Sequence, residues 1–134
     1  MAKIVDVEGI GPVYAKKLIA AGIRTTNRLL LVGSTPSGRK EIASSAGVSE
    51  TLILEWVNHV DLYRIKGVAS EYSDLLEEAG VDTVVELAQR NADNLFMKIV
   101  ETNAKKKLVR KLPTKKQVTD WVNQAKKLPR MVNY

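Results

Sequence analysis

The chain has 134 residues, of which 45% are hydrophobic and 27% charged, and it contains no cysteine. This length suits one domain or two small repeats, the composition is that of a soluble globular protein, and the missing cysteines exclude disulfide and thiolate chemistry. No apolar stretch is long enough for a signal peptide or a membrane span, so the expected location is the cytoplasm.

The net charge of +6 is unevenly distributed along the chain. Residues 98–134 hold eleven basic and two acidic residues, a net charge of +9, whereas residues 1–97 carry −3. A basic region of this kind favours a polyanionic partner through long-range attraction. Composition leaves a second interpretation open, in which these residues form a solvated surface that keeps the protein in solution.

The first half of the chain predicts four helices in sequence. Pro12 suits the first turn of a helix that ends at Gly22, where glycine can adopt a left-handed cap. Thr25 or Thr26 caps a short helix to about residue 32, and "GSTPSG" (residues 33–38) predicts a turn. Further helices are expected over about 39–46 and, with Ser49 as the N-cap, up to about residue 63.

The second half predicts four more helices, over about 70–79, 83–90, 93–110 and 114–127. No segment alternates between apolar and polar residues with a period of two. The expected fold class is therefore all-α.

The two halves read as copies of one unit. "VEGIGPVYAKKLIAAGIRTTNRLL" (7–30) aligns without a gap on "IKGVASEYSDLLEEAGVDTVVELA" (65–88), and "EWVN" (55–58) aligns on "DWVN" (120–123), with seven extra residues in the second copy. We therefore predict two repeats, residues 1–62 and 63–134, packed as one compact helical domain. By pseudo-symmetry, the DWVN helix is expected to pack beside the start of the first repeat and to bring Lys126 and Lys127 near Gly9–Gly11.

The start of the first repeat, with Val7, Gly9-Ile10-Gly11 and Ala15, resembles the helix-hairpin-helix motif. The whole chain resembles a tandem-repeat family catalogued as domain of unknown function 4332, in segments such as "DLYRIKGVASEY", "AGVDTVVELAQRN", "KKLVRKLP" and "WVNQAKKLP". The resemblance implies tandem helix-hairpin-helix repeats. In known helix-hairpin-helix proteins the motif binds the duplex backbone without reading sequence, which implies the same role for Gly9, Ile10 and Gly11.

The chemistry of Gly9–Gly11 supports phosphate binding independently of the family resemblance. Glycine permits a tight corner, and the helix that follows presents free N–H groups and the positive end of its dipole, which suit a phosphate oxygen. Lys16 and Lys17 lie where they can reach neighbouring phosphates. A plain packing corner remains the alternative, because Glu8 beside the loop lowers the local potential. We call Gly9-Ile10-Gly11 the first glycine loop.

The corresponding second glycine loop, Gly67-Val68-Ala69, departs from the pattern. Ala69 stands where the first copy has Gly11 and where related sequences commonly carry glycine. The helix that follows carries Glu71, Asp74, Glu77 and Glu78, which would repel phosphate. We expect this loop to be structural.

The basic C-terminal third is the expected partner surface of the first glycine loop. "AKKKLVRKLPTKK" surrounds one corner between helices, and further basic residues lie on or just past the last helix. The predicted nucleic-acid-binding residues are Gly9, Ile10, Gly11, Lys16, Lys17, Lys105, Lys106, Lys107, Arg110, Lys111, Lys126 and Lys127, and Lys115, Lys116 and Arg130 lie in the same region.

Other residue types give no sign of catalysis or of a bound group. Trp56 and Trp121 occupy equivalent positions, as do Tyr14 and Tyr72, and equivalent aromatics at helical spacing are expected in the core. His59 is the only histidine, so no metal site is expected, and no serine is visibly tied to a histidine–carboxylate pair. We expect no enzyme activity, no cofactor and no small-molecule substrate.

Two functions follow from these features. The first is a non-catalytic, sequence-nonspecific protein that binds duplex DNA through the first glycine loop and the basic C-terminal surface. The alternative is a protein–protein adaptor, in which both hairpins are purely structural and the acidic face around residues 71–78 meets a basic partner.

Overall fold

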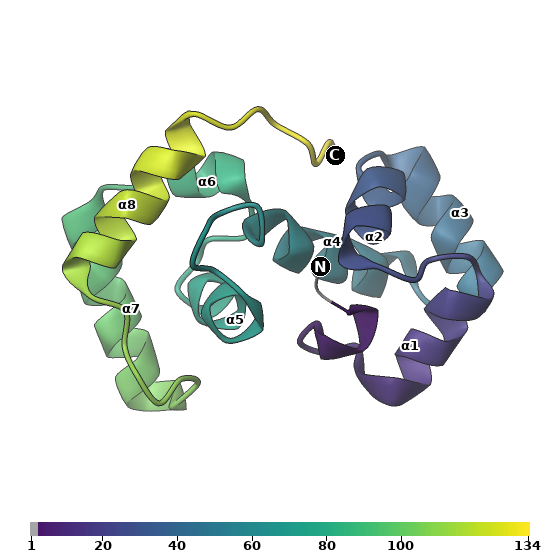
Figure 1. The fold of residues 1–134 in the computed structure, drawn as a ribbon, viewed down its shortest axis with the longest axis horizontal. Helices are drawn as coiled ribbons and strands as arrows, with labels where there is room; N and C mark the ends of the chain where they lie inside the picture. The colour runs from purple at the N-terminus through teal and green to yellow at the C-terminus, as the bar shows by residue number, and fades with distance from the viewer. Residues whose placement is uncertain (1–2) are drawn as a thin grey trace. The chain divides into compact units, whose positions relative to one another are not determined.

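The computed structural model describes residues 3–134, and over this range the chain is all-α (Figure 1). Eight α-helices and one 3-10 helix account for its regular structure, and residues 3–134 contain no strand beyond an isolated bridge between Lys3 and Thr25. Within residues 3–134, every helix is too short or too polar to span a lipid bilayer. Contacts divide the described chain into two units: residues up to Asp61 with Met131–Tyr134 form unit one, and Leu62–Arg130 form unit two.

Unit one is built from a short 3-10 helix and four α-helices. Their order is η1 (Ile4–Asp6), α1 (Gly11–Ala20), α2 (Thr26–Gly33), α3 (Pro36–Ala46) and α4 (Glu50–Leu62), whose last residue opens unit two. The predicted caps are confirmed: Gly22 follows α1 with φ +89°, and Thr25 Oγ1 accepts the N–H of Arg28 at 3.1 Å. Ser49 likewise caps α4 by accepting the N–H of Leu52 at 3.2 Å.

The predicted six-residue turn over residues 33–38 is wrong in length. Helix α2 runs to Gly33 and α3 begins at Pro36, because Thr35 caps α3 by accepting the N–H of Gly38 at 3.0 Å. Both glycines are needed for packing rather than for the turn. A Cβ at Gly33 would lie 2.5 Å from Val57 Cγ2, and one at Gly38 would lie 1.8 Å from the carbonyl oxygen of Val32.

Unit two also contains four α-helices, of which α7 is longer than α3 in unit one. It contains α5 (Ser70–Glu78), α6 (Val84–Ala88), α7 (Ala92–Lys106) and α8 (Lys115–Lys126), with α8 packed against α6 and α7. Its core includes Leu76, Leu87, Ile99 and Trp121. Helix α7 stops four residues before the predicted end, because Lys107 turns into the left-handed region with φ 51°.

A glycine packed under a tryptophan recurs in both units. Gly9 and Gly67 have φ of +86° and +96°, and a Cβ added to them would lie 3.4 Å from Trp56 Nε1 and 3.1 Å from Trp121 Nε1, respectively. A tyrosine contacts each indole: the ring centroids of Tyr14 and Trp56 are 5.1 Å apart, and those of Tyr72 and Trp121 are 5.3 Å apart. Both tryptophans are buried, as predicted.

The tryptophans of the EWVN and DWVN segments each lie over the glycine of their own unit. The indole over Gly9 is that of Trp56 on α4, whereas Trp121 of the DWVN helix covers Gly67 in unit two. Each indole fills the space that the glycine of its own copy leaves open. The expected proximity of Lys126 and Lys127 to Gly9–Gly11 stays a prediction.

The last four residues complete unit one. Val132 is buried, and the N–H of Asn133 donates to the carbonyl of Ser34 at 2.8 Å. Buried Arg39 donates to the carbonyls of Gly33 and Asn133 at 2.9 and 2.8 Å. Desolvation lowers the pKa of Arg39, an effect that the nearby Tyr134 and Glu50 oppose. A charged side chain is therefore held in the interior by backbone carbonyls.

Candidate nucleic-acid interface

The backbone of the first glycine loop leaves few donors for a phosphate. The side chain of Ile10 is buried, and its N–H already donates to the carbonyl of Val7 at 3.0 Å. Helix α1 begins at Gly11, with φ +62°, and Pro12 takes its second position and has no N–H. Since the first N–H groups of a helix have no partner within it, Gly11 and Val13 supply the remaining donors. Ile10 therefore anchors the loop and offers no free donor to a ligand.

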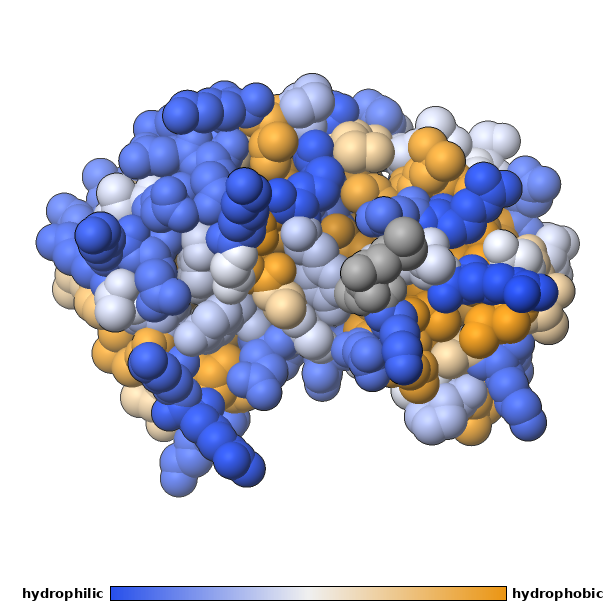
Figure 2. Space-filling view, in the orientation of Figure 1, coloured by the Kyte–Doolittle hydropathy of each residue, from blue (hydrophilic) through white to orange (hydrophobic). Residues whose placement is uncertain are grey.

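The surroundings of the first glycine loop are both basic and hydrophobic. Lys16 and Lys17 are exposed, and Lys17 Nζ lies 5.9 Å from the centroid of the Tyr14 ring. Val13, beside them on α1, is 69% exposed. A depression of about 440 Å³ is lined by Val5, Pro12, Val13, Ala15, Lys16 and Ile19. Figure 2 shows hydrophobic surface over this part of the molecule.

The second glycine loop has a different backbone. Ala69 has φ −126°, an extended conformation that any residue adopts, whereas Gly11 at the equivalent position is left-handed. The side chain of Gln124 on α8 accepts the N–H of Lys66 at 2.9 Å and donates to its carbonyl at 3.2 Å. These bonds tie the segment that enters the loop to α8.

The largest group of cations lies around the turn between α7 and α8, where unit two is longer than unit one. Helix α7 has 15 residues where α3 has 11, and eight residues precede α8 where three precede α4. We call this group the basic turn: Lys105, Lys106, Lys107, Arg110, Lys111, Lys115 and Lys116. Unit one also contains four α-helices in succession without these extra residues, so the extension is not needed to form the helices.

The loop of the basic turn is held at defined points. The side chain of Asn103 accepts the N–H of Val109 at 3.0 Å and donates to its carbonyl at 3.2 Å. Tyr72 donates its hydroxyl to the carbonyl of Lys111 at 3.0 Å. Val109 is buried and Leu108 and Leu112 pack against the core of unit two. The basic side chains of this loop, Lys107, Arg110 and Lys111, are exposed to solvent, while hydrogen bonds hold its backbone in place.

Three cations of the basic turn are partly neutralised. Lys105 pairs with Glu101 at 3.4 Å, Lys115 pairs with Asp93 at 3.0 Å, and Lys106 pairs with Glu78. Four others make no ion pair within residues 3–134: Lys107, Arg110, Lys111 and Lys116. These four carry the unbalanced charge of the basic turn.

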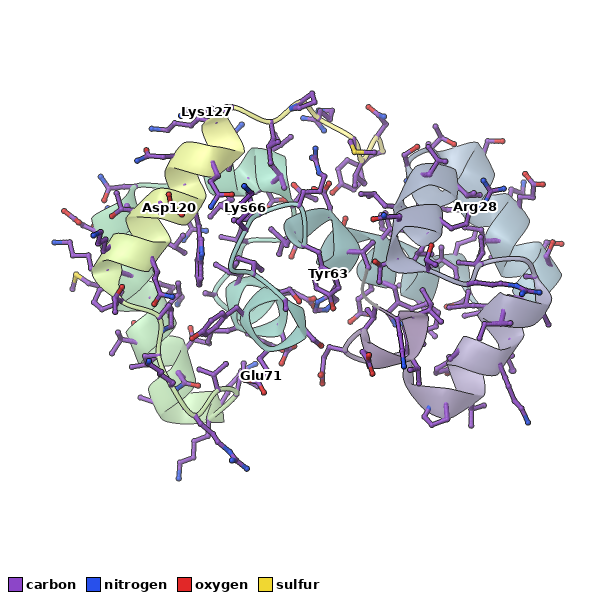
Figure 3. All side chains as sticks on the ribbon, in the orientation of Figure 1. Arg28, Tyr63, Lys66, Glu71, Asp120 and Lys127 are labelled. Carbon is purple, nitrogen blue, oxygen red and sulfur yellow. The ribbon has the colours of Figure 1, made fainter. Side chains whose placement is uncertain are left out.

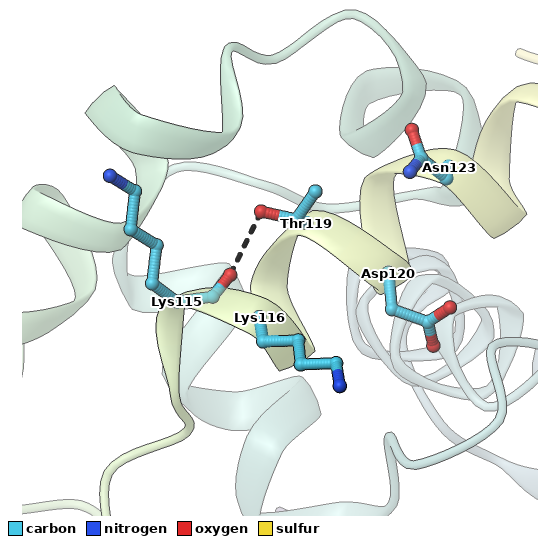
Figure 4. A pocket seen from close by; sticks show the side chains of 5 residues that line it. All are labelled: Lys115, Lys116, Thr119, Asp120 and Asn123. Carbon is cyan, nitrogen blue, oxygen red and sulfur yellow. Dashed lines mark hydrogen bonds between the residues drawn. The ribbon is translucent and has the colours of Figure 1, made fainter.

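The exposed face of α8 continues this surface (Figure 4). A shallow depression of about 470 Å³ is lined by Lys115, Lys116, Thr119, Asp120 and Asn123. Thr119 donates to the carbonyl of Lys115 at 2.9 Å, and Asp120 accepts a hydrogen bond from Gln124 at 2.8 Å. Thr119 and Asn123 were not predicted as site residues. Their spacing of four residues indicates one helix face, on the side away from buried Val118 and Trp121.

The other predicted cations of unit two lie at the far end of α8. The helix has 12 residues and is therefore about 18 Å long, with Lys115 at its start and Lys126 and Lys127 at its end. Figure 3 shows Asp120 and Lys127 projecting from α8. Lys126 and Lys127 are exposed and make no ion pair within the described residues. The predicted nucleic-acid-binding residues of unit two thus form two groups, one at each end of α8.

Residues 3–134 contain no cluster of three or more histidine, cysteine, aspartate or glutamate side chains able to hold a metal. His59 is buried, with 4% of its surface exposed. The described residues therefore offer a surface of cations and hydrogen-bonding groups as the candidate site.

The sequence was compared with known protein families, curated proteins and solved structures. No curated protein and no solved structure matches this chain. The family described as Domain of unknown function (DUF4332) matches residues 8–128, which is most of the sequence. The chain therefore belongs to the DUF4332 family.

Proposed function

We propose that this protein is a non-catalytic, sequence-nonspecific DNA-binding protein that contacts duplex phosphates chiefly through the basic turn. The observation that carries the proposal is the group of four unpaired cations, Lys107, Arg110, Lys111 and Lys116, on and beside a loop pinned by Asn103 and Tyr72. A pinned loop loses less conformational entropy on binding than a mobile one, so more of the electrostatic attraction remains as affinity.

The exposed groups suit phosphate rather than bases. Lysine, arginine, threonine and asparagine side chains donate to phosphate oxygens without reading sequence. Among the described residues, Tyr134 is the one exposed aromatic side chain, and it lies in unit one. No aromatic side chain of unit two is therefore exposed for the stacking of single-stranded bases, and we favour a duplex.

We further propose that both units are helix-hairpin-helix repeats and that the first glycine loop is a second phosphate contact. Positive φ at Gly9, Gly11 and Gly67 and the recurring tryptophan support the repeat. Two backbone donors, Gly11 and Val13, and the nearby Lys16 and Lys17 support a contact at the first loop. The second loop, with Ala69 and an acidic helix after it, has the structural role.

The test is fluorescence anisotropy of a labelled random duplex at about 50 mM and about 200 mM salt. Four phosphates neutralised by the unpaired cations predict a slope of log affinity against log salt of about −4. Replacing Arg110→Glu together with Lys111→Glu is expected to weaken binding about tenfold or more at the lower salt and to flatten the slope by about 2.

The matched control is Lys40→Glu together with Lys98→Glu, two exposed lysines outside the basic turn. It makes the same change in net charge and should alter affinity far less. A separate arm with Lys16→Glu and Lys17→Glu tests the first loop. Equal losses in the control and in the basic-turn variant, or no binding by the wild type at low salt, would refute DNA binding through the basic turn.

One observation favours the alternative function, a protein–protein adaptor with structural hairpins. The depression along α1 is mostly apolar, and exposed hydrophobic side chains grouped on one surface mark interaction sites. A wild type that does not bind DNA would make this surface, rather than the basic turn, the functional one.

A further inference from the structure

Helix α8 carries lysines at both ends of its exposed side and no cation between them. At 3.6 residues per turn, six exposed residues of this helix and its C-cap fall within about 120° of one another around the axis, on the side away from buried Trp121. We call this surface the α8 face: Lys115, Lys116, Thr119, Asn123, Lys126 and Lys127.

The corresponding helix of unit one has none of these cations. When EWVN is aligned on DWVN, the four lysines of the α8 face fall on Glu50, Thr51, Asp61 and Leu62 of α4, and α4 contains no lysine or arginine. Helix α4 nevertheless buries its tryptophan over a glycine, as α8 does. Packing of the helix therefore does not explain the two pairs of lysines.

The lysines of the α8 face are accessible to a ligand. Lys116, Lys126 and Lys127 make no ion pair within residues 3–134. Lys115 pairs with Asp93, but the two side chains are 60% and 66% exposed, so solvent weakens this pair. Both ends of the face can therefore attract an anion.

The spacing of the two pairs suits the width of a DNA groove. Lys126 follows Lys115 by eleven positions, which places the two residues about 16 Å apart along the helix axis. The major groove of B-form DNA is about 12 Å wide, so a helix that crosses it sets its first and last turns over the phosphates of opposite strands. The uncharged middle of the face then lies over the open groove, where no phosphate has to be neutralised.

Other placements of α8 leave phosphates without a cation. Phosphates follow one another about every 3.4 Å along the axis of one strand, so a strand running along α8 would set several of them against Thr119, Asn123 and the adjoining carboxylate of Asp120. The minor groove is about 6 Å wide, so a helix laid across it would carry each pair of lysines about 5 Å past the edge.

We propose that α8 bridges the major groove of duplex DNA, with its Lys115 end on one strand and Lys126 and Lys127 on the other. This inference rests on the proposed DNA binding and names the form of DNA that the site takes, a B-form duplex with an open major groove.

The experiment uses the absence of cysteine from the chain. Asn123→Cys supplies a single thiol at the middle of the α8 face. Random duplexes carry one disulfide-bearing tether, either on N4 of a cytosine in the major groove or on N2 of a guanine in the minor groove. Since a thiol held in the groove has a high effective concentration there, the yield of cross-linked complex should be at least about fivefold higher with the major-groove tether.

The matched control is Asn27→Cys, which makes the same change at an exposed asparagine on α2. It should cross-link poorly and equally to both duplexes. A preference of Asn123→Cys for the minor-groove tether, or a yield as low as that of the control, would overturn the bridging of the major groove.

A second measurement tests the far end of α8. Lys126→Glu together with Lys127→Glu should weaken binding of the random duplex at least about fivefold at about 50 mM salt and flatten the salt slope by about 2. Lys40→Glu with Lys98→Glu makes the same change in net charge and should alter affinity far less.

The outcomes distinguish this inference from the proposed function. If the wild type binds the duplex and the variant at Lys126 and Lys127 binds equally well, the bridge is refuted and DNA binding through the basic turn stands. If the wild type does not bind the duplex at low salt, both are refuted.

Discussion

Gly38 shows how one hydrogen atom can decide the packing of two helices. A Cβ there would lie 1.8 Å from the carbonyl oxygen of Val32, far inside the normal contact distance, and both atoms belong to backbone held by α2 and α3. Since a backbone carbonyl cannot rotate away as a side chain can, the two helices would have to separate.

We therefore predict that Gly38→Ala lowers the free energy of unfolding by about 3 kcal/mol or more, which is large for a surface-proximal substitution. The exposed neighbour Ser37 provides the control, because Ser37→Ala adds no contact and should change stability by less than about 0.5 kcal/mol. Urea denaturation followed by circular dichroism measures both. Equal stability of the two variants would show that the helix junction adjusts freely.

The contrast between Gly11 and Ala69 is a second effect at this scale. The sequence difference suggested that the two loops have different roles, and the structure gives its physical basis. Gly11 has φ +62°, where a Cβ is strained, whereas the extended Ala69 accommodates one. The two loops begin alike at Gly9 and Gly67 and diverge two residues later.

At the scale of the element, the end of α7 depends on a side chain inside the helix. Asn103 holds both backbone groups of Val109, which draws the chain out of the helical path after Lys106. Lys107 takes the left-handed conformation at the cap without being a glycine. The sequence predicted a helix to about residue 110 because no glycine marks this end.

The substitution Asn103→Ala should remove the two hydrogen bonds that hold the loop of the basic turn, while the charges of the loop stay unchanged. We predict a loss of about 1–2 kcal/mol of stability and faster amide hydrogen exchange at Val109, since two hydrogen bonds disappear. Duplex affinity should fall about two- to fivefold, because binding must then order the loop.

Asn94→Ala is the matched control, an exposed asparagine on the same helix whose side chain holds no loop. It should leave exchange at Val109 unchanged. If Asn103→Ala exchanges no faster than this control, the hydrogen bonds of Asn103 do not hold the loop.

At the scale of the whole molecule, unit one is closed by residues that are remote in sequence. Val132 is buried in it, Asn133 bonds Ser34 and Arg39 through its backbone, and Tyr134 donates its hydroxyl to Asn58 at 3.3 Å. The chain therefore visits unit one at its beginning and again at its end.

Removing residues 131–134 should destabilise unit one by about 2 kcal/mol or more, through loss of buried Val132 and of the Asn133 carbonyl that accepts a hydrogen bond from Arg39. Hydrogen exchange resolved by residue should accelerate in α2 and α3 and stay unchanged in α7 and α8. Asn133→Ala serves as the control, because it keeps both backbone bonds and should behave as the wild type. Uniform acceleration in both units would contradict this prediction.

The number and order of the helices, the resemblance of the two halves and the location of the basic residues could be predicted from the sequence. Caps such as Thr25 and Ser49 act on neighbours three residues away, and apolar spacing reports burial, so these features are local and readable. The same holds for the excess of lysine and arginine after residue 98. Four features had to be read from the folded chain: the glycine that each tryptophan covers, the end of α7, the lysines that pair with carboxylates, and the exposure of Val13 and Ile19 on α1. The glycine–tryptophan contacts and the pairs Lys106–Glu78 and Lys115–Asp93 join residues far apart in the chain, whose distances no local pattern contains. The end of α7 depends on Asn103 and Val109, which are only six residues apart but are brought together by a loop without a regular pattern.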